Sequence, residues 1–105
     1  MTFYLYVLKL GDGHYYVGIT TNLKKRIKQH VARTRVGSPW VREHGFVGVQ
    51  AVEDLNTDDR SYAEQFENAK TREYIERYGL DKVRGGQVVS VRNVNHYAKA
   101  QARFG

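Results

Sequence analysis

The sequence predicts a small α/β (α+β) domain in which a three-stranded, mainly antiparallel sheet is flanked by helices, in the order β-β-α-β-α-α. Three observations predict this class. Two apolar, aromatic segments flank a short glycine turn, a third such segment follows later, and the intervening stretches carry apolar residues at helical spacing. The 105 residues give room for a single domain, residues 1–105, with one modest core.

The first two strands are expected at residues 3–10 and 14–19, joined as a β-hairpin by the turn at residues 11–13. Both segments are apolar and aromatic almost throughout and are short for helices. The turn sequence Gly-Asp-Gly marks a reversal of the chain.

The length of the hairpin loop decides which side chains share a face, because side chains alternate along a strand. A three-residue loop with Gly13 in the left-handed region pairs Leu8 with Tyr16 and Tyr6 with Gly18. Tyr6 and Tyr16 then lie diagonally on one face, and Gly18 leaves an opening opposite Tyr6. A two-residue loop would separate the tyrosines, and we predict the three-residue loop.

The first helix is expected at residues 23–34, after the capping side chains of residues 20–22. Leu23, Ile27 and Val31 recur every fourth residue and should face the sheet. A serine followed by proline predicts a short helix at residues 38–44.

The third strand is expected at residues 46–53 and the longest helix at residues 58–78, where Gly79 ends it. An extended segment, QVVSV, and a terminal helix at residues 95–103 should follow. In the long helix, the inward-facing residues are expected to be Ala63, Phe66, Lys70 and Tyr74.

Lysine and arginine number 17 against 11 acidic residues, which gives a net charge of +6. Such an excess favours a polyanionic partner, although it also serves solubility. The acidic residues gather between positions 53 and 76, and basic residues cluster on either side, which suggests one positive surface. We expect this surface to bind DNA through Lys24, Lys25, Lys28, Arg33 and Arg84.

The chain has no cysteine, which excludes disulfides, thiolate zinc sites and cysteine nucleophiles. It also lacks the run of about 18 apolar residues that a membrane helix needs. The residues after Met1 do not resemble a secretion signal. We therefore expect no membrane partner and a cytoplasmic, nucleoid-associated location.

Arg26 and His30 lie one helical turn apart, so their side chains project together. Such a pair on a basic helix is usually a solvated face. Here the helix directly follows the hairpin, and the face that carries Tyr6 and Tyr16 lies beside that edge. This placement favours a shared site.

Glu67 lies within the inward stripe of the long helix. A buried carboxylate needs an ion pair, hydrogen bonds or a metal, because removing it alone from water is costly. Lys70 or Arg26 would supply the ion pair. The functional alternative is a hard divalent cation, which prefers carboxylate oxygen. Glu64 points more outward and is the second choice.

Together these groups suit phosphodiester hydrolysis, which needs an activated water, positive charge at the phosphate and help for the leaving oxygen. Other site types are excluded by their motifs. The chain has no HExxH, no GxxxxGK[ST] and no GxSxG, and its four histidines are not spaced as a metal pair.

In order and spacing, these residues resemble the GIY-YIG nuclease superfamily, as a small stand-alone member. Its first motif would be Leu5-Tyr6-Val7 and its second Tyr16-Val17-Gly18, with Arg26 and His30 following in YYVGITTNLKKRIKQH. The later AEQFE places Glu67 at the position of the family's metal-binding glutamate. The resemblance covers essentially the whole chain.

The resemblance implies a metal-dependent DNA endonuclease in which Glu67 holds one Mg²⁺ or Mn²⁺. Tyr6 would be the general base, with Tyr16 sharing or positioning that work, and Arg26 would neutralise phosphate charge. His30 would hydrogen-bond a tyrosine or relay a proton. Because the pKa of a free phenol is about 10, the arginine and the metal must favour its deprotonation; otherwise His30 takes the proton.

Two departures and two alternatives accompany this resemblance. The first motif reads Leu-Tyr-Val instead of Gly-Ile-Tyr, and Asn93 and Asn95 compete for the family's later asparagine. The alternatives are a catalytically idle nucleic-acid-binding module and a nuclease subunit that needs a partner protein for DNA targeting. A monomer or weak dimer is expected. Structure-selective cleavage in DNA repair, recombination, or phage and mobile-element biology all fit the sequence.

Overall fold

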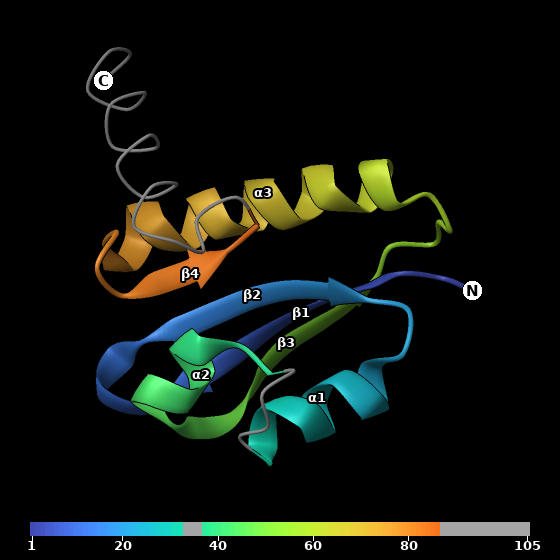
Figure 1. Ribbon diagram of the computed structural model, residues 1–105. Helices are drawn as coiled ribbons and strands as arrows, with labels where there is room; N and C mark the ends of the chain where they lie inside the picture. The colour runs from blue at the N-terminus through green and yellow to red at the C-terminus, as the bar shows by residue number, and fades with distance from the viewer. Residues whose placement is uncertain (33–36, 87–105) are drawn as a thin grey trace.

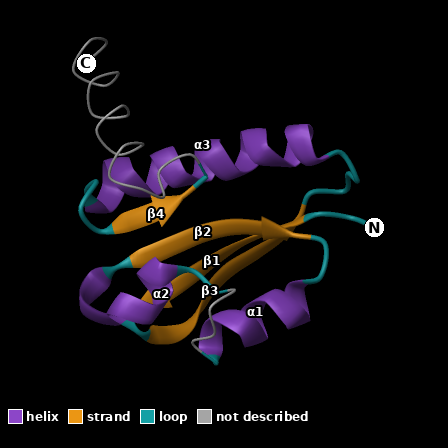
Figure 2. Ribbon diagram, in the orientation of Figure 1, coloured by secondary structure: helices purple, strands orange, loops and turns teal. Residues whose placement is uncertain are grey.

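The computed structural model describes residues 1–32 and 37–86. A sheet forms the middle layer, with the long helix on one face and the two shorter helices on the other (Figures 1 and 2). The elements in chain order are β1 (Tyr4–Leu10), the single-turn η1 (Gly11–Gly13), β2 (Tyr15–Thr20), α1 (Leu23–Val31), α2 (Pro39–His44), β3 (Phe46–Asp54), α3 (Arg60–Tyr78) and β4 (Val83–Gly85).

The predicted register of the hairpin is confirmed. Leu8 pairs with Tyr16 and Tyr6 pairs with Gly18. The turn has three residues, and Gly13 adopts the expected left-handed conformation with φ of 73°. A β-carbon built at Gly18 would meet the hydroxyl end of the Tyr6 ring, so the glycine provides the space that this phenol occupies.

The sheet has four strands in the order β3-β1-β2-β4, so the prediction of three strands is wrong. The added strand, β4, pairs with β2 in parallel, while the β1–β2 and β1–β3 pairs are antiparallel. It is three residues long and forms through contact with a strand far away in sequence. Local apolar periodicity therefore gave no signal for it, and the expected order β-β-α-β-α-α omits it.

The helices begin where the sequence offers capping side chains. Asn22 accepts a hydrogen bond from the backbone N–H of Lys25, and Ser38 caps α2 ahead of Pro39. Asp59 caps α3, two residues later than a start at residue 58 implies. At the other end, Gly79 has φ of 104° and ends α3 as predicted.

Two of the predicted inward stripes need correction. On α1, Leu23 and Ile27 pack against the sheet, but Val31 is 49% exposed and His30 is fully buried instead. A helix has 3.6 residues per turn, so a stripe drawn every fourth residue drifts off the face within two turns.

On α3 the inward face is rotated relative to the predicted stripe. Ala63, Thr71 and Tyr74 are buried, whereas Phe66 is exposed and Lys70 is only partly buried. Glu67 keeps its predicted inward position and is half-buried.

Some expectations lie outside the described residues. They are the end of the first helix, the extended QVVSV segment, the terminal helix at residues 95–103, and the side chains of Arg33, Asn93 and Asn95. Among the helices of residues 1–32 and 37–86, none is long and apolar enough to cross a membrane.

Candidate active site

Tyr6 and His30 form the buried centre of the site. Tyr6 comes from β1 and is 1% exposed, and His30 comes from the last turn of α1 and is 0% exposed. The Tyr6 hydroxyl lies 2.9 Å from Nε2 of His30. The sequence placed these two side chains together, and the structure shows them hydrogen-bonded.

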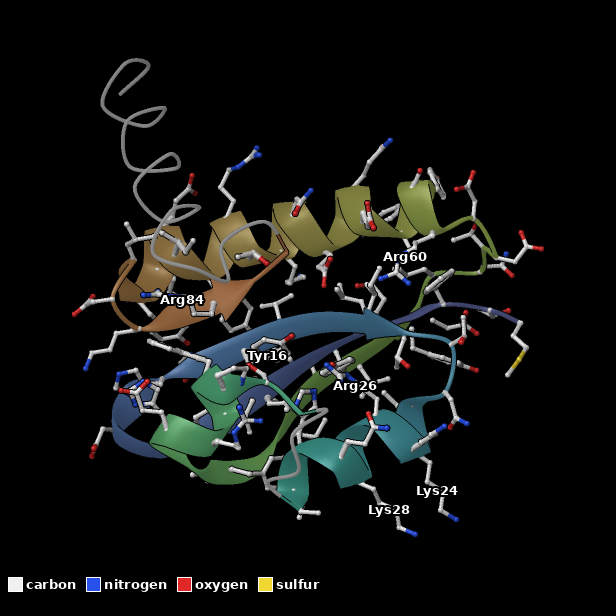
Figure 3. All side chains as sticks on the ribbon, in the orientation of Figure 1. Tyr16, Lys24, Arg26, Lys28, Arg60 and Arg84 are labelled. Atoms are coloured by element: carbon white, nitrogen blue, oxygen red, sulfur yellow. The ribbon has the colours of Figure 1, made fainter. Side chains whose placement is uncertain are left out.

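Tyr16 and Arg26 complete this group from β2 and α1. The Tyr16 ring centroid lies 6.3 Å from that of Tyr6 and 5.2 Å from that of His30. Arg26 lies beside both phenols and lowers the pKa of each through its charge and hydrogen bonding. Figure 3 shows Arg26 on the side of α1 that faces the sheet, close to Tyr16. The guanidinium of Arg26 therefore interacts with both phenols.

Burial and charge set the protonation of these groups. Burial raises the pKa of Tyr6 above its ordinary value, and Tyr16 adds to the rise while Arg26 opposes it. The pKa of Tyr16 is also raised, first by burial. Burial and then Arg26 lower the pKa of His30 to about 4. At neutral pH the site therefore holds two neutral phenols and a neutral imidazole beside one cation.

Glu67 faces this group from α3 and reaches the edge of β2 that β4 leaves uncovered. The backbone N–H groups of Gly86 and Ile19 lie near its carboxylate and lower its pKa. Tyr15 donates its N–H to the carbonyl of Lys82, the residue before β4. Because strand N–H groups alternate between edges, the N–H of Ile19 points the same way. Since β4 ends at Gly85, Ile19 lies beyond its last pair. The Glu67 carboxylate lies where the next carbonyl of β4 would face the N–H of Ile19.

Burial and neighbouring charges shift the protonation of Glu67. Burial raises its pKa to about 7, nearby Glu64 adds to the rise, and the charge of Arg60 opposes it. The proposed ion pairs are not formed: Lys70 pairs with Glu73 at 2.9 Å, and within the described part of the chain no cation lies within ion-pair distance of Glu67. Glu64 is more exposed and pairs with Arg60 at 3.2 Å.

Residues 1–32 and 37–86 contain no group of three or more His, Cys, Asp or Glu side chains that could hold a metal. The donor set at Glu67 is therefore one carboxylate supported by two backbone N–H groups. This set fits a hard divalent cation that keeps most of its water ligands. It does not fit zinc, which needs three or four protein ligands.

Among residues 1–32 and 37–86, the predicted DNA-binding residues are not gathered around this centre. Lys24, Lys25 and Lys28 are exposed, and Figure 3 shows Lys24 and Lys28 extending away from the protein. Arg84 lies elsewhere, where its Nη1 donates to the carbonyls of Leu80 and Val83.

The guanidinium of Arg84 also stacks over the Trp40 ring at 4.3 Å. Arg84 therefore makes contacts that stabilise the fold, and its contact with DNA stays a prediction.

Two residues of the site were not predicted. Gln29 accepts a hydrogen bond from Nη1 of Arg26 at 3.0 Å. Ser38, expected only as a helix cap, donates its backbone N–H to Nδ1 of His30 at 3.2 Å, and its hydroxyl lies near Tyr16. The sequence signal for Ser38 was the capping pattern alone, which gives no indication of a tertiary contact.

Comparison with known proteins gives a consistent result. The family model of the GIY-YIG catalytic domain matches residues 2–84. The chain is similar to a UPF0213 protein of Fusobacterium nucleatum subsp. nucleatum, with 30% identity over 77 residues that cover 73% of this chain and 72% of the relative. No solved structure matches the chain.

Proposed function

Because the chain belongs to the GIY-YIG family, we propose that it is a metal-dependent endonuclease that hydrolyses phosphodiester bonds in DNA. The observation that carries this proposal is the buried hydrogen bond between Tyr6 and His30, with Arg26 beside the same phenol. A core tyrosine kept only for packing has no need of a buried histidine and a guanidinium at its hydroxyl. Here the polar groups converge on one oxygen.

In this mechanism Arg26 binds a non-bridging phosphate oxygen and stabilises the charge that develops there. Tyr6 takes the proton of the attacking water. Its raised pKa means that it must first release its own proton to solvent water, and Arg26 is the residue that lowers the cost of this step. Tyr16 also interacts with Arg26, and it positions the water or the phosphate.

Glu67 is the residue that would hold the cation, Mg²⁺ or Mn²⁺. Metal dependence is general among GIY-YIG nucleases. When bound, the cation supplies positive charge to the phosphate and to the leaving oxygen. The carboxylate is kept in place by Ile19 and Gly86. Because its pKa is about 7, cation binding and proton binding compete at this group near neutral pH.

DNA is proposed as the substrate because of the net charge of +6 and the exposed lysines of α1. These lysines point away from the phenols, so they suit phosphates on either side of the cleaved bond. Contacts of this kind carry no base information. We therefore propose recognition of DNA shape, in repair, recombination or mobile-element processes, with a partner protein as an alternative means of targeting.

The test is cleavage of duplex, branched and single-stranded DNA with Mg²⁺, with Mn²⁺ or with EDTA. Glu67→Gln should lower the rate by at least roughly 10²-fold, because it removes the charge that holds the cation. Glu76→Gln is the matched control, since Glu76 is exposed on the same helix.

Each other outcome has a definite meaning. Cleavage that persists in EDTA or in Glu67→Gln contradicts the metal assignment. Binding to all three substrates without cleavage supports an idle nucleic-acid-binding module instead.

A further inference from the structure

Ser38, the residue that caps α2, contacts two side chains of the candidate active site, His30 and Tyr16. It is 6% exposed, and its backbone N–H donates to Nδ1 of His30 at 3.2 Å. Its Oγ accepts the N–H of Trp40 at 3.2 Å, and its hydroxyl lies near Tyr16 and lowers the pKa of that phenol. A single buried residue therefore reaches two of the site's aromatic side chains.

The contact with His30 determines where the hydrogen of the imidazole lies. A backbone N–H can only donate, so Nδ1 of His30 must be the acceptor and carries no hydrogen. His30 is neutral at physiological pH because its side chain is buried beside Arg26. A neutral imidazole has one N–H, and here it must be on Nε2.

The consequence reaches Tyr6. Nε2 lies 2.9 Å from the Tyr6 hydroxyl, and with its hydrogen in place it donates to the phenol oxygen. The proton of Tyr6 therefore cannot move to His30, because both ring nitrogens are already engaged. A donated hydrogen bond favours the phenolate form.

We propose that Ser38 is a positioning residue that fixes His30 as the Nε2–H tautomer, so that His30 donates a hydrogen bond to Tyr6 and does not act as the general base. The catalytic part of this inference rests on the proposed nuclease function. The tautomer itself does not. This assigns His30 one of the two roles that the sequence leaves open.

The conformation of Ser38 allows its N–H to be removed cleanly. Its φ of −68° and ψ of 132° are values that proline adopts without strain. Ser38→Pro deletes the N–H and the hydroxyl, whereas Ser38→Ala deletes only the hydroxyl. The difference between the two variants isolates the N–H that His30 accepts.

The first test is nitrogen NMR of the full chain with labelled histidine, without metal and without DNA. We expect wild type and Ser38→Ala to show His30 with a protonated Nε2 and a bare Nδ1, and Ser38→Pro to show a mixture of tautomers. A protonated Nδ1 in wild type, or an unchanged tautomer in Ser38→Pro, overturns the proposal. Circular dichroism checks that each variant is folded.

The second test is cleavage. Ser38→Pro should cleave roughly 10- to 100-fold more slowly than Ser38→Ala, the range expected for losing a hydrogen bond to a charged oxygen. Equal rates in the two variants contradict the role of the N–H.

The third test separates a donor from a base without relying on proline. The amide of glutamine can accept from Ser38 through its oxygen and donate to Tyr6 through its nitrogen, but it cannot take a proton. His30→Gln should therefore retain at least about 10-fold more activity than His30→Leu, as one donor hydrogen bond predicts. Equal loss in both would show that His30 is needed as a base.

Failure of the two proposals is distinguishable. If wild type cleaves no DNA under any condition, the proposed function fails, while the NMR result still decides whether Ser38 fixes the tautomer.

Discussion

The two faces of the sheet are built by the same strands and filled with different chemistry. Odd-numbered residues of β1 and β2, such as Leu5 and Val17, pack against α3 in a cluster of apolar and tyrosine side chains. Even-numbered residues such as Tyr6 and Leu8 face α1 and α2 in a smaller cluster. Next to that smaller cluster, His30 and Ser38 are buried.

The difference shows how one small chain separates folding from chemistry. The face toward α3 supplies most of the apolar burial that drives folding. The opposite face gives up apolar volume to bury a hydrogen-bonded polar group, which is tolerated because its members satisfy one another. Alternation along the strands separates the two roles for the strand residues, and Glu67 is the one site residue that comes from α3.

Paired substitutions on the two faces test this separation most strongly. Tyr6→Phe should lower the cleavage rate by roughly 10²- to 10⁴-fold, as loss of a general base does. Its stability should fall by about 1–3 kcal/mol, the cost of leaving the buried donor of His30 without an acceptor. Ile75→Ala, on α3, should lose about 2–5 kcal/mol of stability and keep its rate per folded molecule.

Initial rates and thermal unfolding of both proteins provide the measurements. If Ile75→Ala slows the folded enzyme as much as Tyr6→Phe does, the two faces do not have separate roles.

A methyl group added at Gly18 should displace the Tyr6 ring from its position in the active site. Gly18→Ala places its β-carbon against the Tyr6 hydroxyl, so the ring must shift. We expect a rate loss on the order of 10-fold or more, since misplaced groups lose catalysis steeply. The stability cost should be about 1–3 kcal/mol.

Gly48→Ala is the control, because a β-carbon at Gly48 in β3 meets nothing within 4 Å. Wild-type cleavage by Gly18→Ala would contradict the close contact with Tyr6.

The pH dependence of stability gives opposite signs for two residues of the site. The pKa of Glu67 is raised from 4.5 to about 7, so the folded state holds its proton more tightly and stability falls as pH rises through that window. The pKa of His30 is lowered from 6.5 to about 4, so stability falls as pH drops through that window.

Thermal unfolding of wild type, Glu67→Gln and His30→Gln between these pH values separates the two slopes. Glu67→Gln should lose the decline toward neutral pH, and His30→Gln should lose the decline toward acid. Mg²⁺ should reduce the first slope in wild type, because the cation stabilises the ionised carboxylate. An unchanged slope in either variant contradicts the corresponding shift.

The smallest effect is expected for the outer lysines. Lys28→Ala should weaken DNA binding slightly and lower the slope of log affinity against log salt by about one. Its rate at saturating DNA should stay unchanged.

Arg84→Ala should instead lower the melting temperature, because Arg84 bonds backbone carbonyls and stacks on Trp40. A full salt effect from Arg84→Ala and none from Lys28→Ala would reverse these roles.

The sequence predicted those parts of the structure that depend on local rules. The three-residue turn with a left-handed Gly13 determined the register, and the register placed Tyr6 beside Tyr16 and opposite Gly18. Helical spacing then placed Arg26 and His30 on one edge of α1. All of these contacts are near in sequence.

The parts that were missed depend on contacts between distant segments. β4 pairs with β2 where Val83 is buried, and Ser38 belongs to the site because its backbone N–H, at the start of α2, reaches His30. The exposed Val31 shows a further limit, since apolar spacing does not tell where a helix stops touching its sheet. The fold class was therefore predictable in outline and the support of the site was not.

The early end of β4 has a consequence for how the carboxylate is held. In a finished ladder, a backbone carbonyl of β4 would accept the N–H of Ile19. Here Glu67 takes the place of that missing carbonyl, so an ionisable group fills a backbone position. An insertion that extended β4 would compete with Glu67 for the same N–H and release the carboxylate. The length of an edge strand thus sets whether this protein has a charged group where its chemistry needs one.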